Sequence, residues 1–88
     1  MEENKEYFIY FLRSLRNTKV YTGKTKKHPK LRLEEHNRGI NSWTKRNGPF
    51  VLVYFEKYFC KKDMDERERF FKTGVGRRVR NAILKEFW

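Results

Sequence analysis

Apolar and polar residues follow strand-like alternation in three stretches of the chain. The first stretch, from Tyr7 to Leu12, is apolar on both faces, because side chains alternate along a strand. One face carries Tyr7, Ile9 and Phe11, and the other carries Phe8, Tyr10 and Leu12. A strand that is apolar on both faces is normally buried on both. We therefore expect a central strand here.

Two further strands are expected to pair with it. Residues 19–24 contain the strand formers Val20, Tyr21 and Thr22 and close a hairpin through the polar turn 14–18. Gly23 marks a place where the backbone can be approached closely. Residues 50–59 form the longest apolar stretch, and strict alternation gives two faces. One face holds Val51, Val53, Phe55 and Phe59, and the other holds Leu52, Tyr54, Glu56 and Tyr58.

The segment between the second and third strands predicts one helix and one loop. Pro29 suits the first turn of a helix and Gly39 suits its end. Arg32 and His36 are four residues apart and share a face of that helix. Residues 40–48 are expected to form a polar, basic loop, which carries Trp43, Lys45 and Arg46.

Two helices are predicted after the third strand. The first covers residues 63–72, where Met64 and Phe71 mark the core face and Glu68 lies on that same face. The second begins near residues 76–78, and its core stripe is Val75, Val79, Ile83 and Phe87. Asn81 lies off the stripe. An inward carboxylate needs a cationic partner, a metal or a functional reason, and an ion pair with an arginine is the structural alternative for Glu68.

These elements predict a small α/β (α+β) fold in the order β-β-α-β-α-α, with a three-stranded, mostly antiparallel sheet flanked by helices. The 88 residues suit one domain, spanning 1–88 with a core of about 6–85 and a frayed end at 1–6. We expect a monomer. The single cysteine, Cys60, excludes a disulfide framework within it. The polar N-terminus does not look like a signal peptide, and no apolar run reaches membrane-spanning length, so a cytoplasmic protein is expected.

The charge balance points to a polyanionic partner. Lys and Arg number 22 against 11 Asp and Glu, which gives a formal net charge of +11. Nucleic acid is the usual partner of so basic a small domain, and a ribosome-like or solubility-driven basic surface is the alternative. Trp43 among cations suits stacking on nucleic acid, or else it folds back to cover the core.

Two tyrosines on a hairpin, an Arg/His pair and an inward glutamate form a set that suits phosphodiester hydrolysis. That reaction needs a base for water, a cation for the developing charge and a carboxylate to hold a divalent metal. Taken one at a time, Tyr10 and Tyr21 could equally be ordinary strand aromatics.

The ordered motifs resemble those of the GIY-YIG nuclease superfamily, in its small single-domain bacterial branch. The motifs read Phe8-Ile9-Tyr10, Tyr21-Thr22-Gly23, Arg32-Leu-Glu-Glu-His36-Asn37 and Arg67-Glu68-Arg-Phe-Phe-Lys72-Thr-Gly. Phe8 replaces the first glycine of the family pattern, and Thr22 replaces its isoleucine. Neither change removes a side chain to which the family gives a catalytic role.

The resemblance implies a role for each matching residue. Tyr10 is implied as the general base for water, and Lys24 or His36 could take its proton. Tyr21 would position water or relay the proton, and Arg32 would hold the scissile phosphate, where a planar fork fits well. Glu68 is implied to bind a single Mg²⁺ or Mn²⁺. The residues expected to contact nucleic acid are Arg32, Lys45, Arg46, Trp43, Lys72 and Asn81.

The expected function is that of a metal-dependent endonuclease that hydrolyses phosphodiester bonds in DNA, in repair or recombination. A protein partner could supply targeting, because the chain shows no additional recognition domain. The alternative is a non-catalytic, basic nucleic-acid-binding module on the same fold. A basic adaptor for an acidic protein explains neither the tyrosines nor the arginine. Only the nuclease explains why Glu68 faces inward on a protein that recruits anions.

Overall fold

The computed structural model describes residues 5–88 and contains the predicted elements in the predicted order, with one additional short helix. The elements are β1 (Tyr7–Ser14), β2 (Val20–Thr25), α1 (Pro29–Asn37), α2 (Ser42–Asn47), β3 (Phe50–Tyr58), α3 (Lys61–Phe71) and α4 (Gly74–Phe87). The α+β fold class is thus confirmed. The frayed end was expected at residues 1–6, and residues 1–4 lie outside the described part of the chain. Glu6 forms an ion pair with Lys57.

The sheet has three antiparallel strands in the order β2-β1-β3. This order confirms β1 as the central strand. Its residues from Tyr7 to Leu12 are all buried, as expected for a strand that is apolar on both faces. β2 leaves one edge of the sheet unpaired.

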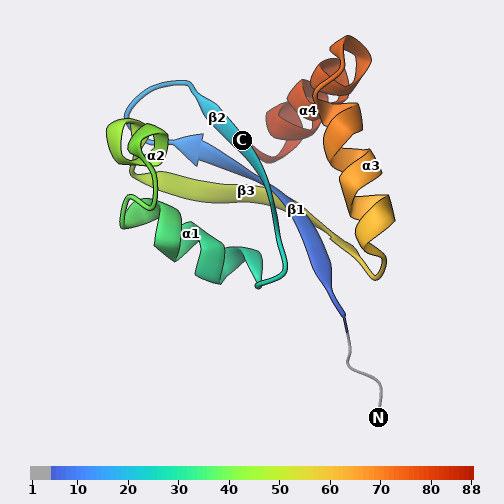
Figure 1. Ribbon diagram of the computed structural model, residues 1–88. Coiled ribbons are helices and arrows are strands. Elements are labelled where there is room, and N and C mark those ends of the chain that lie inside the picture. The colour runs from blue at the N-terminus through green and yellow to red at the C-terminus, as the bar shows by residue number, and fades with distance from the viewer. Residues whose placement is uncertain (1–4) are drawn as a thin grey trace.

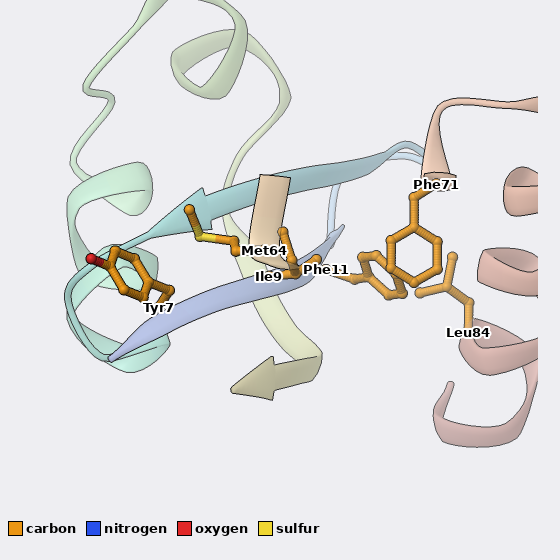
Figure 2. Packing of buried hydrophobic residues seen from close by; sticks show 6 residues of the cluster. All are labelled: Tyr7, Ile9, Phe11, Met64, Phe71 and Leu84. Atoms are coloured by element: carbon orange, nitrogen blue, oxygen red, sulfur yellow. The ribbon is translucent and has the colours of Figure 1, made fainter. Parts of the chain in front are cut away.

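Helices cover both faces of the sheet (Figure 1). α1 and α2 lie on the face that carries Tyr10 and Leu12, where Leu33, Trp43 and Phe50 complete a core cluster. α3 and α4 cover the opposite face (Figure 1). There Phe11 contacts Phe71 edge-on at 5.0 Å between ring centroids, with Leu84 beside them (Figure 2). Each face of β1 therefore anchors its own pair of helices.

A β-bulge changes the predicted faces of β3. Phe11 pairs with Tyr54 whereas Leu12 pairs with Leu52, so Val53 is an extra residue in the ladder. Leu52 consequently packs with the α1 cluster, and Tyr54 packs on the α3 and α4 side. The prediction that Leu52 and Tyr54 share a face is wrong, because strict alternation does not survive a bulge.

The expected loop at 40–48 contains the six-residue helix α2. The side chain of Asn41 accepts a hydrogen bond from the Thr44 backbone at 2.8 Å, and the Thr44 hydroxyl lies 3.3 Å from the Asn41 amide. This reciprocal capping box satisfies amides that an isolated turn leaves unpaired. The prediction of a loop over the whole of residues 40–48 is wrong, because capping can hold a helix that shows no apolar periodicity.

The core stripe of α4 is rotated from the predicted one. Val75 and Phe87 are 55% and 58% exposed, whereas Leu84 is buried. Gly76 sits against α3, and an added Cβ would lie 1.6 Å from the Phe70 carbonyl oxygen. Because α4 docks through this glycine, the face at Val79, Ile83 and Leu84 turns to the core.

Candidate active site

The buried centre of the site is a hydrogen bond between two strictly enclosed side chains. Tyr10 Oη and His36 Nε2 are 2.8 Å apart, and both residues are 0% exposed. β1 supplies the tyrosine and α1 supplies the histidine, so the pair joins the sheet to the helix. The predicted proximity of the hairpin tyrosine and the helix histidine is therefore present in the structure.

Gly23 makes room for this pair on β2. It lies opposite Tyr10 in the register of the hairpin. An added Cβ would lie 2.4 Å from the Tyr10 hydroxyl and 2.8 Å from the Tyr21 ring. Real Cβ atoms do not tolerate such contacts, so the glycine is needed for the close approach of the phenol.

Burial keeps both members of the pair neutral. It raises the pKa of Tyr10 to about 12, and the neighbouring Arg32 guanidinium offsets only part of that rise. Burial, followed by the positive charge of Arg32, lowers the pKa of His36 to about 4. His36 Nδ1 is buried and has no hydrogen-bond partner among the described residues. A neutral imidazole beside a neutral phenol can accept a hydrogen bond from the hydroxyl.

Arg32 lies one turn before His36 on α1 and borders the same hydroxyl. Its Nη1 contacts Glu35 Oε1 at 3.3 Å, and 30% of its side chain is exposed. A guanidinium with a partly free fork can still bind a phosphate oxygen. The Arg/His spacing thus brings a cation and a proton acceptor to one place.

Tyr21 lies at the solvent side of the cluster. Its ring is 4.6 Å from the His36 ring and 5.5 Å from the Trp43 ring, measured between centroids. Trp43 stacks on Phe50 at 5.7 Å with an interplanar angle of 16°. Trp43 therefore covers the core on one side, as the structural alternative expected.

Asn37 positions α1, although no role was predicted for it. Its Nδ2 donates to the Phe50 carbonyl at 3.2 Å, and its Oδ1 accepts from the Phe50 amide at 2.7 Å. This pair of bonds fixes the end of α1 against the start of β3 and so holds the adjacent His36. The partner lies 13 residues away, and no local signal in the sequence reveals it.

Glu68 and Lys24 form a second cluster on the opposite side of the sheet. Glu68 pairs with Lys24 at 3.3 Å and with Lys72 at 3.6 Å. Asp65 also pairs with Lys24 at 3.1 Å. Among the described residues the cations paired with Glu68 are thus two exposed lysines, and the structural alternative of an arginine partner is wrong.

The suggestion that Lys24 takes the Tyr10 proton does not hold. Gly23 faces Tyr10, so the next residue on the strand faces the other side of the sheet. Hydrogen bonds to Asp65 and Glu68 raise the pKa of Lys24, so its amine stays protonated. His36 is the group in contact with the phenol.

Comparison with models of protein families shows to which family the chain is related. The family model described as the GIY-YIG catalytic domain matches residues 6–81. The chain belongs to the GIY-YIG family. A relative among curated proteins is "UPF0213 protein CPE1444" of Clostridium perfringens (strain 13 / Type A), which is 35% identical over 66 residues, covering 74% of this chain and 69% of that protein. No solved structure matches the chain.

The GIY-YIG family is of nuclease type, and the matched span contains every predicted catalytic and metal-binding residue. The individual roles of those residues stay predictions. Among residues 5–88, no helix has the length and apolar character needed to cross a membrane.

The carboxylates of this GIY-YIG domain suit only a loosely held divalent ion. No group of three or more His, Cys, Asp or Glu within residues 5–88 could hold a metal. Mg²⁺ often keeps several waters and takes one or two carboxylates together with substrate phosphates. Glu68, with 16% of its side chain exposed, fits that mode if an ion displaces the lysines. The donor set does not fit a site built from protein ligands alone.

The remaining predicted nucleic-acid contacts of the GIY-YIG domain are exposed. Lys45 and Arg46 lie on α2, Lys72 follows α3, and Asn81 lies on α4. Arg46 Nε donates to the Ser42 carbonyl, and none of the four is buried. Because these four side chains are exposed, they can be reached by nucleic acid, and their contacts with it stay predictions.

A half-buried network outside this cluster contains an arginine that the sequence did not reveal. Glu56 accepts hydrogen bonds from the Tyr54 and Tyr58 hydroxyls, both at 2.6 Å, and pairs with Arg67 through two 3.0 Å bonds. Burial acts to raise the pKa of Glu56, but these donors outweigh it and lower the pKa. Alternation along the strand predicts that Glu56 shares a face with Tyr54 and Tyr58. Arg67 lies 11 residues away on another element, so no local pattern predicts its contact with Glu56.

We expect the stability of the GIY-YIG domain to fall on acidification between pH 6.5 and about 4, because of His36. In that window the unfolded chain binds a proton on this histidine that the folded chain, with a pKa of about 4, does not. The loss reaches about 3 kcal/mol below the window. The groups facing His36 are Tyr10, Tyr21, Arg32 and Glu35, and only Glu35 is acidic.

Denaturant unfolding at several pH values measures this effect. His36→Gln should flatten the slope above pH 4.5, and the exposed His28→Gln serves as the matched control. A slope that survives His36→Gln contradicts the assignment. An NMR titration of the His36 ring in the unaltered protein gives its pKa directly.

Proposed function

We propose that the chain is an endonuclease that hydrolyses phosphodiester bonds in DNA with one divalent metal ion. The observation that carries the proposal is the 2.8 Å bond between Tyr10 and His36, two enclosed polar groups beside the Arg32 guanidinium. A fully buried pair of this kind adds little to stability, because His36 Nδ1 is left without a partner among residues 5–88. Its position beside the partly exposed Arg32 guanidinium favours a chemical role.

Tyr10 acts as the general base by relay. With His36 neutral and its ring proton on Nδ1, the Tyr10 hydroxyl donates to Nε2. As the phenol gives this proton to His36, it takes one from the attacking water. A free phenolate is avoided, which matters because the pKa of Tyr10 is about 12.

Substrate binding prepares His36 for this step. The positive charge of Arg32 is one cause of the low pKa of His36. A phosphate bound to Arg32 would neutralise that charge and bring a negative charge near the imidazole. Both changes raise the pKa of His36, so the ring becomes a better proton acceptor once the scissile phosphate is in place.

The edge strand β2 joins the two clusters of the site. Gly23 faces the Tyr10 cluster and Lys24 faces Glu68, so adjacent residues border both sides of the free edge. A phosphodiester lying over this edge can reach Arg32 on one side and Glu68 on the other. When bound at Glu68, Mg²⁺ or Mn²⁺ supplies Lewis-acid stabilisation of charge on the leaving oxygen.

Cleavage of labelled nucleic acid tests the proposal. Single-stranded, duplex and forked DNA, with matched RNA, are incubated with Mg²⁺, Mn²⁺ or EDTA. We expect internal cleavage of DNA with either metal and none with EDTA. Binding without cleavage in every metal condition would instead support the non-catalytic nucleic-acid-binding module. Such a module also accounts for the net charge of +11.

A further inference from the structure

A hollow lies between the start of β2 and α4, next to the candidate active site. Its volume is about 860 Å³, within the range of roughly 300–1,000 Å³ typical of ligand sites. Both tryptophans of the chain, Trp43 and Trp88, line it. We call this hollow the tryptophan groove.

Both indoles are held in place by a neighbour. Trp43 stacks on Phe50, and the Arg13 guanidinium lies 4.5 Å over the Trp88 ring. Trp88 is nevertheless 51% exposed. Rings fixed in this way lose little freedom when a flat ligand stacks on them, and nucleobases stack on aromatic side chains regardless of sequence.

Three of the other lining residues are basic, and the remainder are neutral. Lys19, Arg80 and Lys85 line the groove together with Asn81, and no lining residue is acidic. None of the three cations takes part in an ion pair within the described part of the chain. The Arg80 guanidinium donates only to the neutral Asn81 side chain. Cations without a carboxylate partner around an aromatic surface match a ligand that has flat rings and phosphates.

The groove adjoins the Tyr10 cluster through one contact. The Trp43 ring is 5.5 Å from the Tyr21 ring, which in turn is 4.6 Å from the His36 ring. A nucleotide in the groove would therefore place a neighbouring stretch of its strand beside Tyr21.

We propose that the tryptophan groove binds an unpaired nucleobase, with its flanking phosphates on Lys19, Arg80 and Lys85. A base inside a duplex has both faces covered by its neighbours and cannot stack on an indole. The preferred substrate therefore contains a single-stranded or unstacked segment. This preference rests on the proposed nuclease function, whereas the binding itself does not.

Intrinsic fluorescence reports directly on this groove, because both tryptophans line it. The full chain in EDTA is titrated with a short oligodeoxythymidine, with an abasic strand of equal length and with a duplex. We expect the oligodeoxythymidine to quench the fluorescence and to bind about tenfold more tightly than the abasic strand, as loss of one stacked base predicts. Equal quenching and affinity for the abasic strand would overturn the proposal.

Variants separate stacking from general charge. Trp88→Leu should weaken binding of the intact strand about tenfold and leave binding of the abasic strand unchanged. Lys85→Ala should weaken binding more than Lys62→Ala, the matched control on the outer face of α3; equal effects would overturn the site. Base-dependent quenching in a protein that never cleaves supports the groove and overturns the nuclease, and cleavage without base-dependent quenching overturns only the groove.

Discussion

Tyr10→Phe is expected to reduce cleavage by about 10²- to 10⁴-fold, because it removes the hydroxyl that relays the proton from water to His36. The ring stays, so the packing of β1 persists. The variant leaves His36 Nε2 unpaired and should lose about 1–3 kcal/mol of unfolding free energy. Single-turnover cleavage, measured below the melting range of the variant, gives the effect.

Tyr58→Phe is the matched control. It also removes a hydroxyl that makes a short bond, 2.6 Å to Glu56, but on the other side of the sheet. Its stability should fall by a similar amount while its cleavage rate stays near that of the unaltered protein. If Tyr10→Phe cleaves as well as Tyr58→Phe, the phenol is not the base.

Glu68→Ala is expected to abolish cleavage while leaving the fold nearly intact. Its partners Lys24 and Lys72 have side chains that are 43% and 63% exposed, so neither becomes a buried, unpaired charge. The loss of stability should therefore be about 1 kcal/mol or less, as for surface ion pairs. Binding of nucleic acid in EDTA should be unchanged or tighter, because a negative charge is removed from a surface that faces phosphate.

Asp65→Ala provides the comparison on the same helix. Asp65 shares Lys24 with Glu68 and also pairs with Lys61 at 2.7 Å. If Glu68 holds the metal alone, Asp65→Ala cleaves normally. The experiment measures cleavage against Mn²⁺ concentration and melting with and without Mn²⁺ and uncleavable DNA. A large drop in melting temperature for Glu68→Ala, with no metal effect in either protein, would remove the metal role.

The sequence by itself determined the central strand, the hairpin and the Arg/His face of α1. Each of these follows from a local rule: two-residue alternation in β1, strand formers after a polar turn in the hairpin, and four-residue spacing in α1. Alternation along β2 also places Lys24 and Tyr21 on opposite faces of the sheet. This placement argues against Lys24 as the acceptor of the Tyr10 proton, which the family resemblance had implied.

Only the tertiary structure decided which long-range contacts complete the site. The bulge at Val53 depends on how β3 registers with β1, and the rotation of α4 depends on Gly76 meeting the Phe70 carbonyl. The low pKa of His36 likewise depends on burial, which its four-residue spacing from Arg32 does not give. Periodicity fixes which residues share a face of one element, whereas strand register and helix docking are set by packing between elements distant in sequence.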